Sequence, residues 1–68
     1  MKLEFICAET KGSILLENRF ETEKGKYRIV IRRYNSNLYF FKYRNGDLLE
    51  CQNLSTAKPK EVKENDNG

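Results

Sequence analysis

The chain has no histidine and no tryptophan, and only two of its 68 residues are cysteine. Histidine is the commonest acid–base side chain near neutral pH and the commonest ligand of transition metals. Two cysteines without histidine do not make the four-ligand set of a zinc site. No serine, threonine or cysteine has a recognisable base partner, and no glycine-rich phosphate loop is present. We therefore expect a non-enzymatic protein with no catalytic residues, no metal site and no cofactor.

Long apolar runs are also missing, whereas a membrane-spanning helix needs about 20 apolar residues in succession. The first ten residues, MKLEFICAET, contain Glu4 and lead into no apolar stretch of the kind found in a secretory signal peptide. We therefore expect no membrane association and a cytoplasmic location. In a reducing compartment, Cys7 and Cys51 are expected to be buried thiols rather than a disulfide, although the sequence leaves open whether they are neighbours.

Acidic residues are absent from the middle of the chain. Every charged residue between positions 24 and 46 is basic: Lys24, Lys26, Arg28, Arg32, Arg33, Lys42 and Arg44. The segments before and after this block carry more acidic than basic residues. Such a block indicates either a solvated pair of strands or a surface that attracts an anionic partner.

The residues that are present predict an all-β fold. Turn signals recur at Lys11-Gly12, near Gly25, at Asn35-Ser36 and at Asn45-Gly46, and the segments between them are rich in β-branched and aromatic residues. We predict a five-stranded antiparallel meander in residues 1–54, followed by a polar, flexible tail in residues 55–68. The expected strands cover residues 2–9, 14–22, 26–34, 37–44 and 47–53.

Alternation along these strands divides the side chains between two faces. With tight turns, one face receives most of the aliphatic residues, and we predict that it is the core: Leu3, Phe5, Cys7, Ile14, Leu16, Phe20, Ile29, Ile31, Leu38, Phe40, Leu49 and Cys51. A flat sheet with a bare apolar face would aggregate. We expect the sheet to curl into a small SH3-like or open barrel; packing against a second copy and coverage by the tail are the alternatives.

The opposite face is predicted to display arginines beside aromatic rings. The expected register pairs Arg32 with Tyr39, Val30 with Phe41, and Arg28 with Tyr43. Arginine over an exposed ring stabilises a sheet modestly, but a patch of this size also suits an interaction site. The residues predicted to bind a partner are Arg28, Arg32, Tyr34, Tyr39, Phe41, Tyr43 and Leu48, with Tyr34 and Leu48 at the margin.

Tyrosine and arginine predominate at the energetic centres of protein–protein interfaces. We therefore predict a small binding protein that docks this basic, aromatic face onto an acidic or partly apolar surface of a protein. In size it resembles the compact inhibitors and accessory proteins of phages and mobile elements, an analogy that rests on no motif. The alternative is a single-stranded nucleic-acid-binding protein that uses the same face, since bases stack on rings and cations follow phosphates. Homodimerisation through this face or through edge strands is a third expectation.

Overall fold

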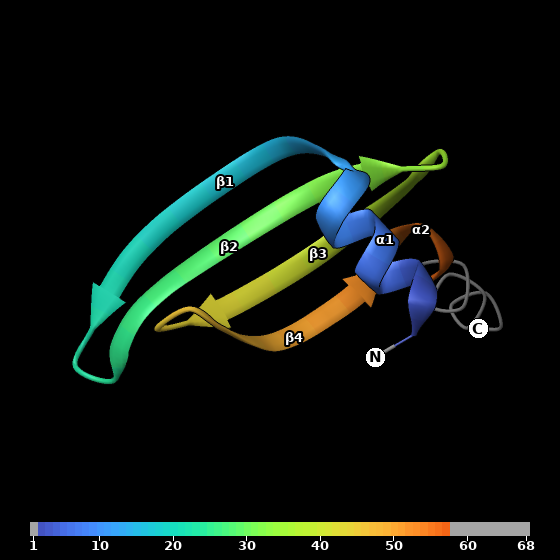
Figure 1. Cartoon of the computed structure of the whole chain (residues 1–68). Coiled ribbons are helices and arrows are strands. Elements are labelled where there is room, and N and C mark those ends of the chain that lie inside the picture. Colours follow the sequence, from blue (N-terminus) through green and yellow to red (C-terminus); the bar gives the residue numbers. More distant parts are fainter. Residues whose placement is uncertain (1, 58–68) are drawn as a thin grey trace, which may run out of the picture.

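A computed structural model describes residues 2–57 of the chain (Figure 1). The elements are α1 (Leu3–Lys11), β1 (Ser13–Thr22), β2 (Gly25–Tyr34), β3 (Asn37–Arg44), β4 (Asp47–Asn53) and α2 (Leu54–Ala57). The strands form one open, four-stranded antiparallel sheet in the order β1-β2-β3-β4. The expectation of a small, mostly β domain built as an antiparallel meander is thus confirmed.

The prediction of five strands in an SH3-like form is not confirmed, because the first expected strand is the helix α1 and the sheet stays open at β1 and β4. The segment is rich in good helix formers such as Leu3, Glu4 and Ala8. Glu4 lies in the first turn and Lys11 in the last, where each charge is favourable to the helix dipole. Its short apolar run fits both the helical and the strand period, so the sequence pattern did not exclude a strand. The strand predicted for residues 2–9 is nevertheless wrong.

The hairpin of β2 and β3 has the predicted register. Asn35 and Ser36 both have positive φ, of 52° and 66°, as a two-residue type I′ turn requires. As a result Arg32 lies opposite Tyr39, Val30 opposite Phe41, and Arg28 opposite Tyr43.

The other hairpins differ from the predicted registers. The β1–β2 turn is shorter than expected, so that Phe20 lies opposite Tyr27 rather than Ile29. The turn at Asn45-Gly46 is present, but an irregularity after it leaves Leu49 unpaired between Leu48 and Glu50. A bulge reverses the alternation of a strand locally. Cys51 therefore lies opposite Phe41, on the other face from the one predicted.

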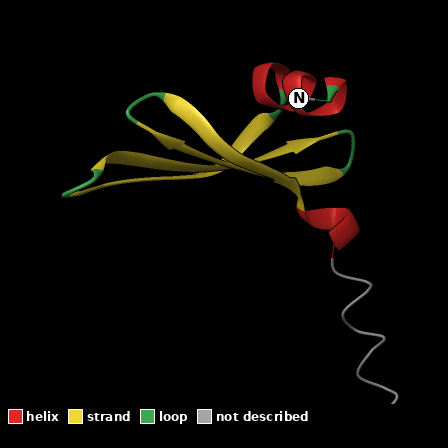
Figure 2. Ribbon diagram, turned by 90° about the horizontal axis from the view of Figure 1, so that it is seen from below, coloured by secondary structure: helices red, strands yellow, loops and turns green. Residues whose placement is uncertain are grey.

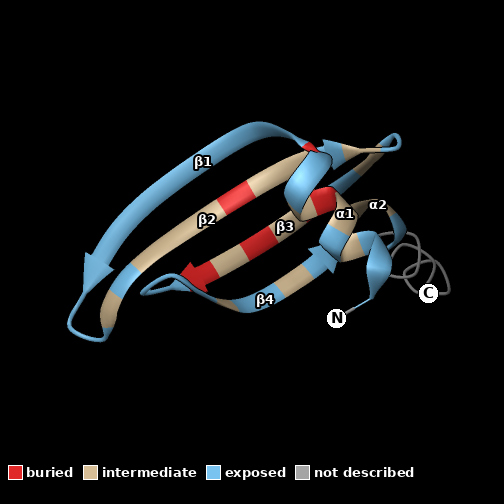
Figure 3. Cartoon of the chain, viewed as in Figure 1, coloured by how far each residue is buried: buried red, intermediate tan, exposed pale blue. Residues whose placement is uncertain are grey.

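The core lies between α1 and one face of the sheet (Figures 1 and 3). Its buried members are Ala8, Val30, Tyr39, Phe41 and Tyr43, and Phe5, Tyr34, Leu48 and Cys51 pack against them. This is the face that we predicted to be free for a partner. The arrangement follows from α1, which needs an apolar partner for its inner side and finds it on this face of β2 and β3.

The C-terminal part of the described chain turns away from α1. Figure 2 shows α2 at one end of the sheet, on the side opposite α1. Leu38 N–H donates to Ser55 Oγ at 2.9 Å, and Ser55 N–H donates to Asn53 Oδ1 at 2.9 Å. The expected flexible tail therefore begins with an ordered turn, and residues 58–68 lie outside the described part.

Candidate functional site

The aromatic residues predicted as partner contacts are buried under α1. The exposed fractions of Tyr39, Phe41 and Tyr43 are 3%, 0% and 8%, and Tyr34 and Leu48 are half-buried beside them. The sequence correctly placed these residues on one face, but the expectation that the face is exposed is wrong. Arg28 and Arg32 line a groove beside α1, and Tyr43 lines it with them.

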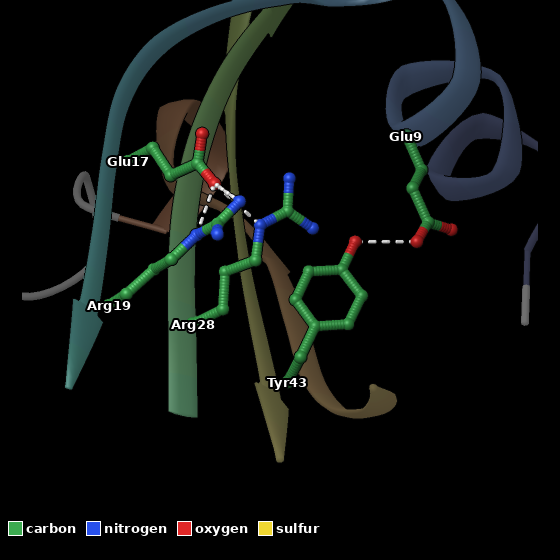
Figure 4. Close-up of polar contacts among 5 residues, drawn as sticks. All are labelled: Glu9, Glu17, Arg19, Arg28 and Tyr43. Carbon is green, nitrogen blue, oxygen red and sulfur yellow. Dashed lines mark hydrogen bonds and ion pairs between the residues drawn. The ribbon is translucent and has the colours of Figure 1, made fainter. Parts of the chain in front are cut away.

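Both buried tyrosines are anchored to α1 by acidic side chains. Tyr43 Oη donates to Glu9 Oε2 at 2.5 Å (Figure 4), and Tyr39 Oη donates to Glu4 Oε2 at 3.3 Å. Phe5 meets Tyr39 edge to face, with ring centroids 5.6 Å apart. Burial, together with the bond to Glu9, raises the pKa of Tyr43 to about 12. Burial and the nearby Glu4 carboxylate likewise raise the pKa of Tyr39.

These contacts predict an alkaline destabilisation that depends on Tyr43. The ordinary pKa of a tyrosine is 10.0, and that of Tyr43 in the folded chain is about 12. Between these two pH values the unfolded chain binds fewer protons than the folded chain, so the free energy of unfolding falls as the pH rises. At neutral pH, Tyr43→Phe should lower the free energy of unfolding by about 1–2 kcal/mol, because it removes a hydrogen bond to a carboxylate. The difference between wild type and variant should shrink above pH 10, and urea titrations at several pH values would measure it. If the difference in the free energy of unfolding stayed constant to pH 12, the alkaline destabilisation would not come from Tyr43.

The face expected to be the core is largely uncovered by the described residues: α1 packs on the other side, and α2 contacts this face mainly along β3, where Ser55 bonds to Leu38. Its apolar side chains are Leu16, Phe20, Tyr27, Ile29, Ile31, Leu38 and Phe40; we call this set the uncovered face. Leu16 is 50% exposed and Phe20 is 41% exposed. Phe20 stacks on Tyr27 with ring centroids 5.2 Å apart, and Lys42 Nζ lies 5.7 Å from the Tyr27 ring centre.

Basic side chains accompany the uncovered face. Arg33, Lys42 and Arg44 lie on the same side of β2 and β3, and none of them forms an ion pair within residues 2–57. Glu50, opposite Lys42, and Asp47, opposite Arg44, are the acidic residues beside them. Apart from Tyr27, the apolar residues of the uncovered face were predicted to share one face, but that face was expected to be the interior. The spacing of Phe5 and Ala8 is compatible with a helix that covers the other face, but the same short segment also fits a strand.

A groove opens on the other side of the sheet, where β1 and β2 extend beyond α1. It has a volume of about 1180 Å³, and its charged lining includes Glu9, Arg19, Glu21, Lys26, Arg28 and Arg32. Glu17, on β1, accepts from Arg28 Nε at 2.7 Å and from Arg19 Nη2 at 2.9 Å through the same oxygen, Oε2 (Figure 4). These arginines hold the pKa of the Glu17 carboxyl below its usual value. The Arg28 guanidinium also lies over the Tyr43 ring, 5.2 Å from its centre.

Comparisons with known proteins add no family to this description. No protein-family model matches the chain, and no curated protein or solved structure is similar enough to count as a match. Within residues 2–57, no helix is long and apolar enough to span a membrane, and no cluster of three or more candidate ligands could hold a metal ion. The uncovered face and the groove are therefore the features from which a function can be argued.

Proposed function

We propose that the chain is a small non-enzymatic binding protein that docks the uncovered face of its sheet onto a protein partner. The observation that carries this proposal is the set of apolar side chains on β1, β2 and β3 that α1 does not cover and that α2 borders mainly along β3. Such a set forms a contiguous patch of roughly several hundred Å², a size that on soluble proteins usually marks an interaction site. The predicted function is retained, but its site moves to the opposite side of the sheet.

The charges beside the patch favour a partner surface with an apolar centre and an acidic rim. Arg33, Lys42 and Arg44 outnumber Asp47 and Glu50 along the strands of this face. A second copy stacked on the same face would bring these cations against their own equivalents, which opposes association. Residues 58–68 are also a poor cover, because their sequence, KPKEVKENDNG, offers few apolar side chains.

Site-specific photo-crosslinking would locate the docking surface. A photoreactive amino acid at Leu16 reports on the uncovered face, and one at Ile6 reports on the outer side of α1; both residues are exposed. In the cells that naturally make the chain, we expect the Leu16 probe to capture one defined protein and the Ile6 probe to capture little of it. Equal capture at both positions would contradict docking through the sheet face.

A quantitative prediction concerns the affinity of the chain for the captured protein after that protein has been purified. Leu16→Ala combined with Leu38→Ala should weaken binding about 10- to 100-fold, since central interface side chains each contribute about 1 kcal/mol or more. The matched control, Leu3→Ala combined with Ile6→Ala, removes exposed apolar side chains from α1 and should change affinity less than about 3-fold. Calorimetric titration would measure both variants, and unchanged affinity in the first would refute the proposal.

A second candidate function is the binding of single-stranded nucleic acid by the same face. The stacked rings of Phe20 and Tyr27, with Lys42 over Tyr27, offer the combination of aromatic platform and cation that such proteins use. Salt dependence separates the two functions. Affinity for an oligonucleotide should fall log-linearly with salt concentration, whereas a protein interface with apolar anchors should lose mainly association rate.

A further inference from the structure

We propose that the groove between α1 and the β1–β2 hairpin binds a phosphate-class oxyanion through the guanidinium groups of Arg28 and Arg32. This site lies on the α1 side of the sheet and does not depend on docking through the uncovered face. It would make the chain a ligand-binding protein as well as a docking protein.

Hydrogen-bond donors and acceptors are unequally matched in the groove. One oxygen of Glu17 accepts from both Arg19 and Arg28. Arg28 uses its Nε in this contact, and Figure 4 shows its terminal nitrogens pointing away from Glu17 toward the side of Tyr43. The terminal nitrogens of Arg28 form no hydrogen bond within residues 2–57, and they are placed to receive further acceptor atoms.

Arg32 supplies a second, independent sign of a missing acceptor. Its Nη1 donates to Gly12 O at 2.8 Å, which holds the side chain against the junction of α1 and β1. Its Nε is buried and has no hydrogen-bond partner within the described chain. Leaving a buried donor unsatisfied is unfavourable. An anionic oxygen that reaches this nitrogen would remove the penalty.

The arrangement of charge points the same way. Arg19 lies directly opposite Arg28 across β1 and β2, a pairing of like charges that destabilises a sheet. Glu17 offsets only part of this repulsion, and Lys26 and Arg32 add further positive charge to the groove, against Glu9 and Glu21. A bound anion would therefore be attracted by the groove as a whole and would relieve the repulsion between the arginines.

The number of donors favours phosphate over a single carboxylate. The terminal nitrogens of Arg28 and the guanidinium group of Arg32 come from positions four residues apart on one face of β2. A phosphate group presents three or four oxygens in a tetrahedral arrangement and can accept from several such directions, and guanidinium groups bind it through paired hydrogen bonds. A planar carboxylate would leave more of these donors without a partner.

Side-chain NMR with isotope-labelled full-length chain would test the site directly. The Nε–H resonances are followed while inorganic phosphate or pyrophosphate is added and sodium chloride keeps the ionic strength constant. We expect saturable shifts at Arg28 and Arg32, with the same residues responding to both probes. Arg33 and Arg44, on the uncovered face, are the internal controls. Shifts that fail to saturate, or that are equal at all four arginines, would overturn the proposal.

Substitution of Glu17 is expected to strengthen phosphate binding instead of weakening it. Glu17→Gln removes the carboxylate that competes for Arg19 and Arg28, so phosphate affinity should rise by about 5-fold or more. Glu21→Gln removes the same charge from the groove but no ion pair, and the rise should stay below about 2-fold. Equal effects of the two variants would indicate general attraction rather than a built site, and would refute the assignment to Arg28.

A short single-stranded oligonucleotide forms the last arm of the titration, because a phosphodiester backbone offers the same oxyanion chemistry. If pyrophosphate and the oligonucleotide shift the same Arg28 and Arg32 resonances and compete, the phosphate site is the one that a nucleic acid uses. If only the free anions bind, the ligand is a small phosphate compound. An oligonucleotide that shifts only Arg33 and Arg44 would separate nucleic-acid binding on the uncovered face from the groove.

Discussion

Replacement of Phe41 by alanine is expected to leave much of the protein unfolded at room temperature. Phe41 is fully buried between α1 and the sheet, at the centre of the core cluster. Removing a buried phenylalanine ring typically lowers the free energy of unfolding by about 3–5 kcal/mol. A domain of this size has a total stability of only about 3–8 kcal/mol. Circular dichroism during urea unfolding, with the folded fraction measured by NMR, would quantify the loss.

The adjacent residue provides the matched control. Phe40 is the same amino acid in the same strand, but it faces the uncovered side and is only half-buried. Phe40→Ala should therefore lower stability by about half as much or less, since less apolar surface leaves the protein interior. The sequence interpretation, with Phe40 in the core and Phe41 outside, demands the reverse order. A larger loss for Phe40→Ala than for Phe41→Ala would contradict the packing of α1 on this face.

The second large effect is expected at the contact between α1 and the sheet. Ala8 is 0% exposed and lies in the cluster with Val30, Tyr39, Phe41 and Tyr43. Ala8→Glu would place a carboxylate there without a cationic partner, and burying an unpaired charge carries a penalty of several kcal/mol. We expect the helix to separate from the sheet or the whole domain to unfold. Hydrogen exchange of the α1 and β3 amides would distinguish these results, and either would support the contact.

Ile6→Glu is the control for this substitution, because Ile6 lies on the same helix but is 43% exposed. It should change stability by less than about 1 kcal/mol. In the strand predicted for residues 2–9, Ile6 and Ala8 would share one face and the two substitutions would have similar effects. Their difference therefore tests helix against strand, and equal destabilisation would favour the strand.

Much of the sheet was accessible from local sequence. Asn35, Asn45 and Gly46 adopt positive φ more readily than other residues and so mark the turns, and the turn at Asn35-Ser36 also sets the register of β2 with β3. Alternation along these strands then separates Val30, Tyr39, Phe41 and Tyr43 from Ile29, Ile31, Leu38 and Phe40. The grouping of Arg28 and Arg32 beside aromatic rings followed from the same register, and the structure places both arginines at the groove.

The bulge at Leu49 and the short turn before Gly25 lay beyond such reasoning, because their alternatives fit the sequence equally well. So did the choice between helix and strand for residues 3–11, where a short apolar run satisfies either period. A register deduced from the length of a loop is correct only when neither strand contains a bulge. A single extra residue in one strand moves a side chain such as Cys51 to the other face of the sheet.

The sequence by itself determined that the chain forms an antiparallel sheet with two apolar faces and, along β2 and β3, which residues share each face. Only the tertiary structure decided which face is the interior. Alternation separates the faces but does not rank them, since each carries aliphatic and aromatic side chains. Burial is set by the covering element, and α1 packs where the small side chain of Ala8 allows close approach and where Glu4 and Glu9 meet the hydroxyl groups of Tyr39 and Tyr43. The rings that suggested a docking surface thereby became the core, and the residues expected inside became the surface available to a partner.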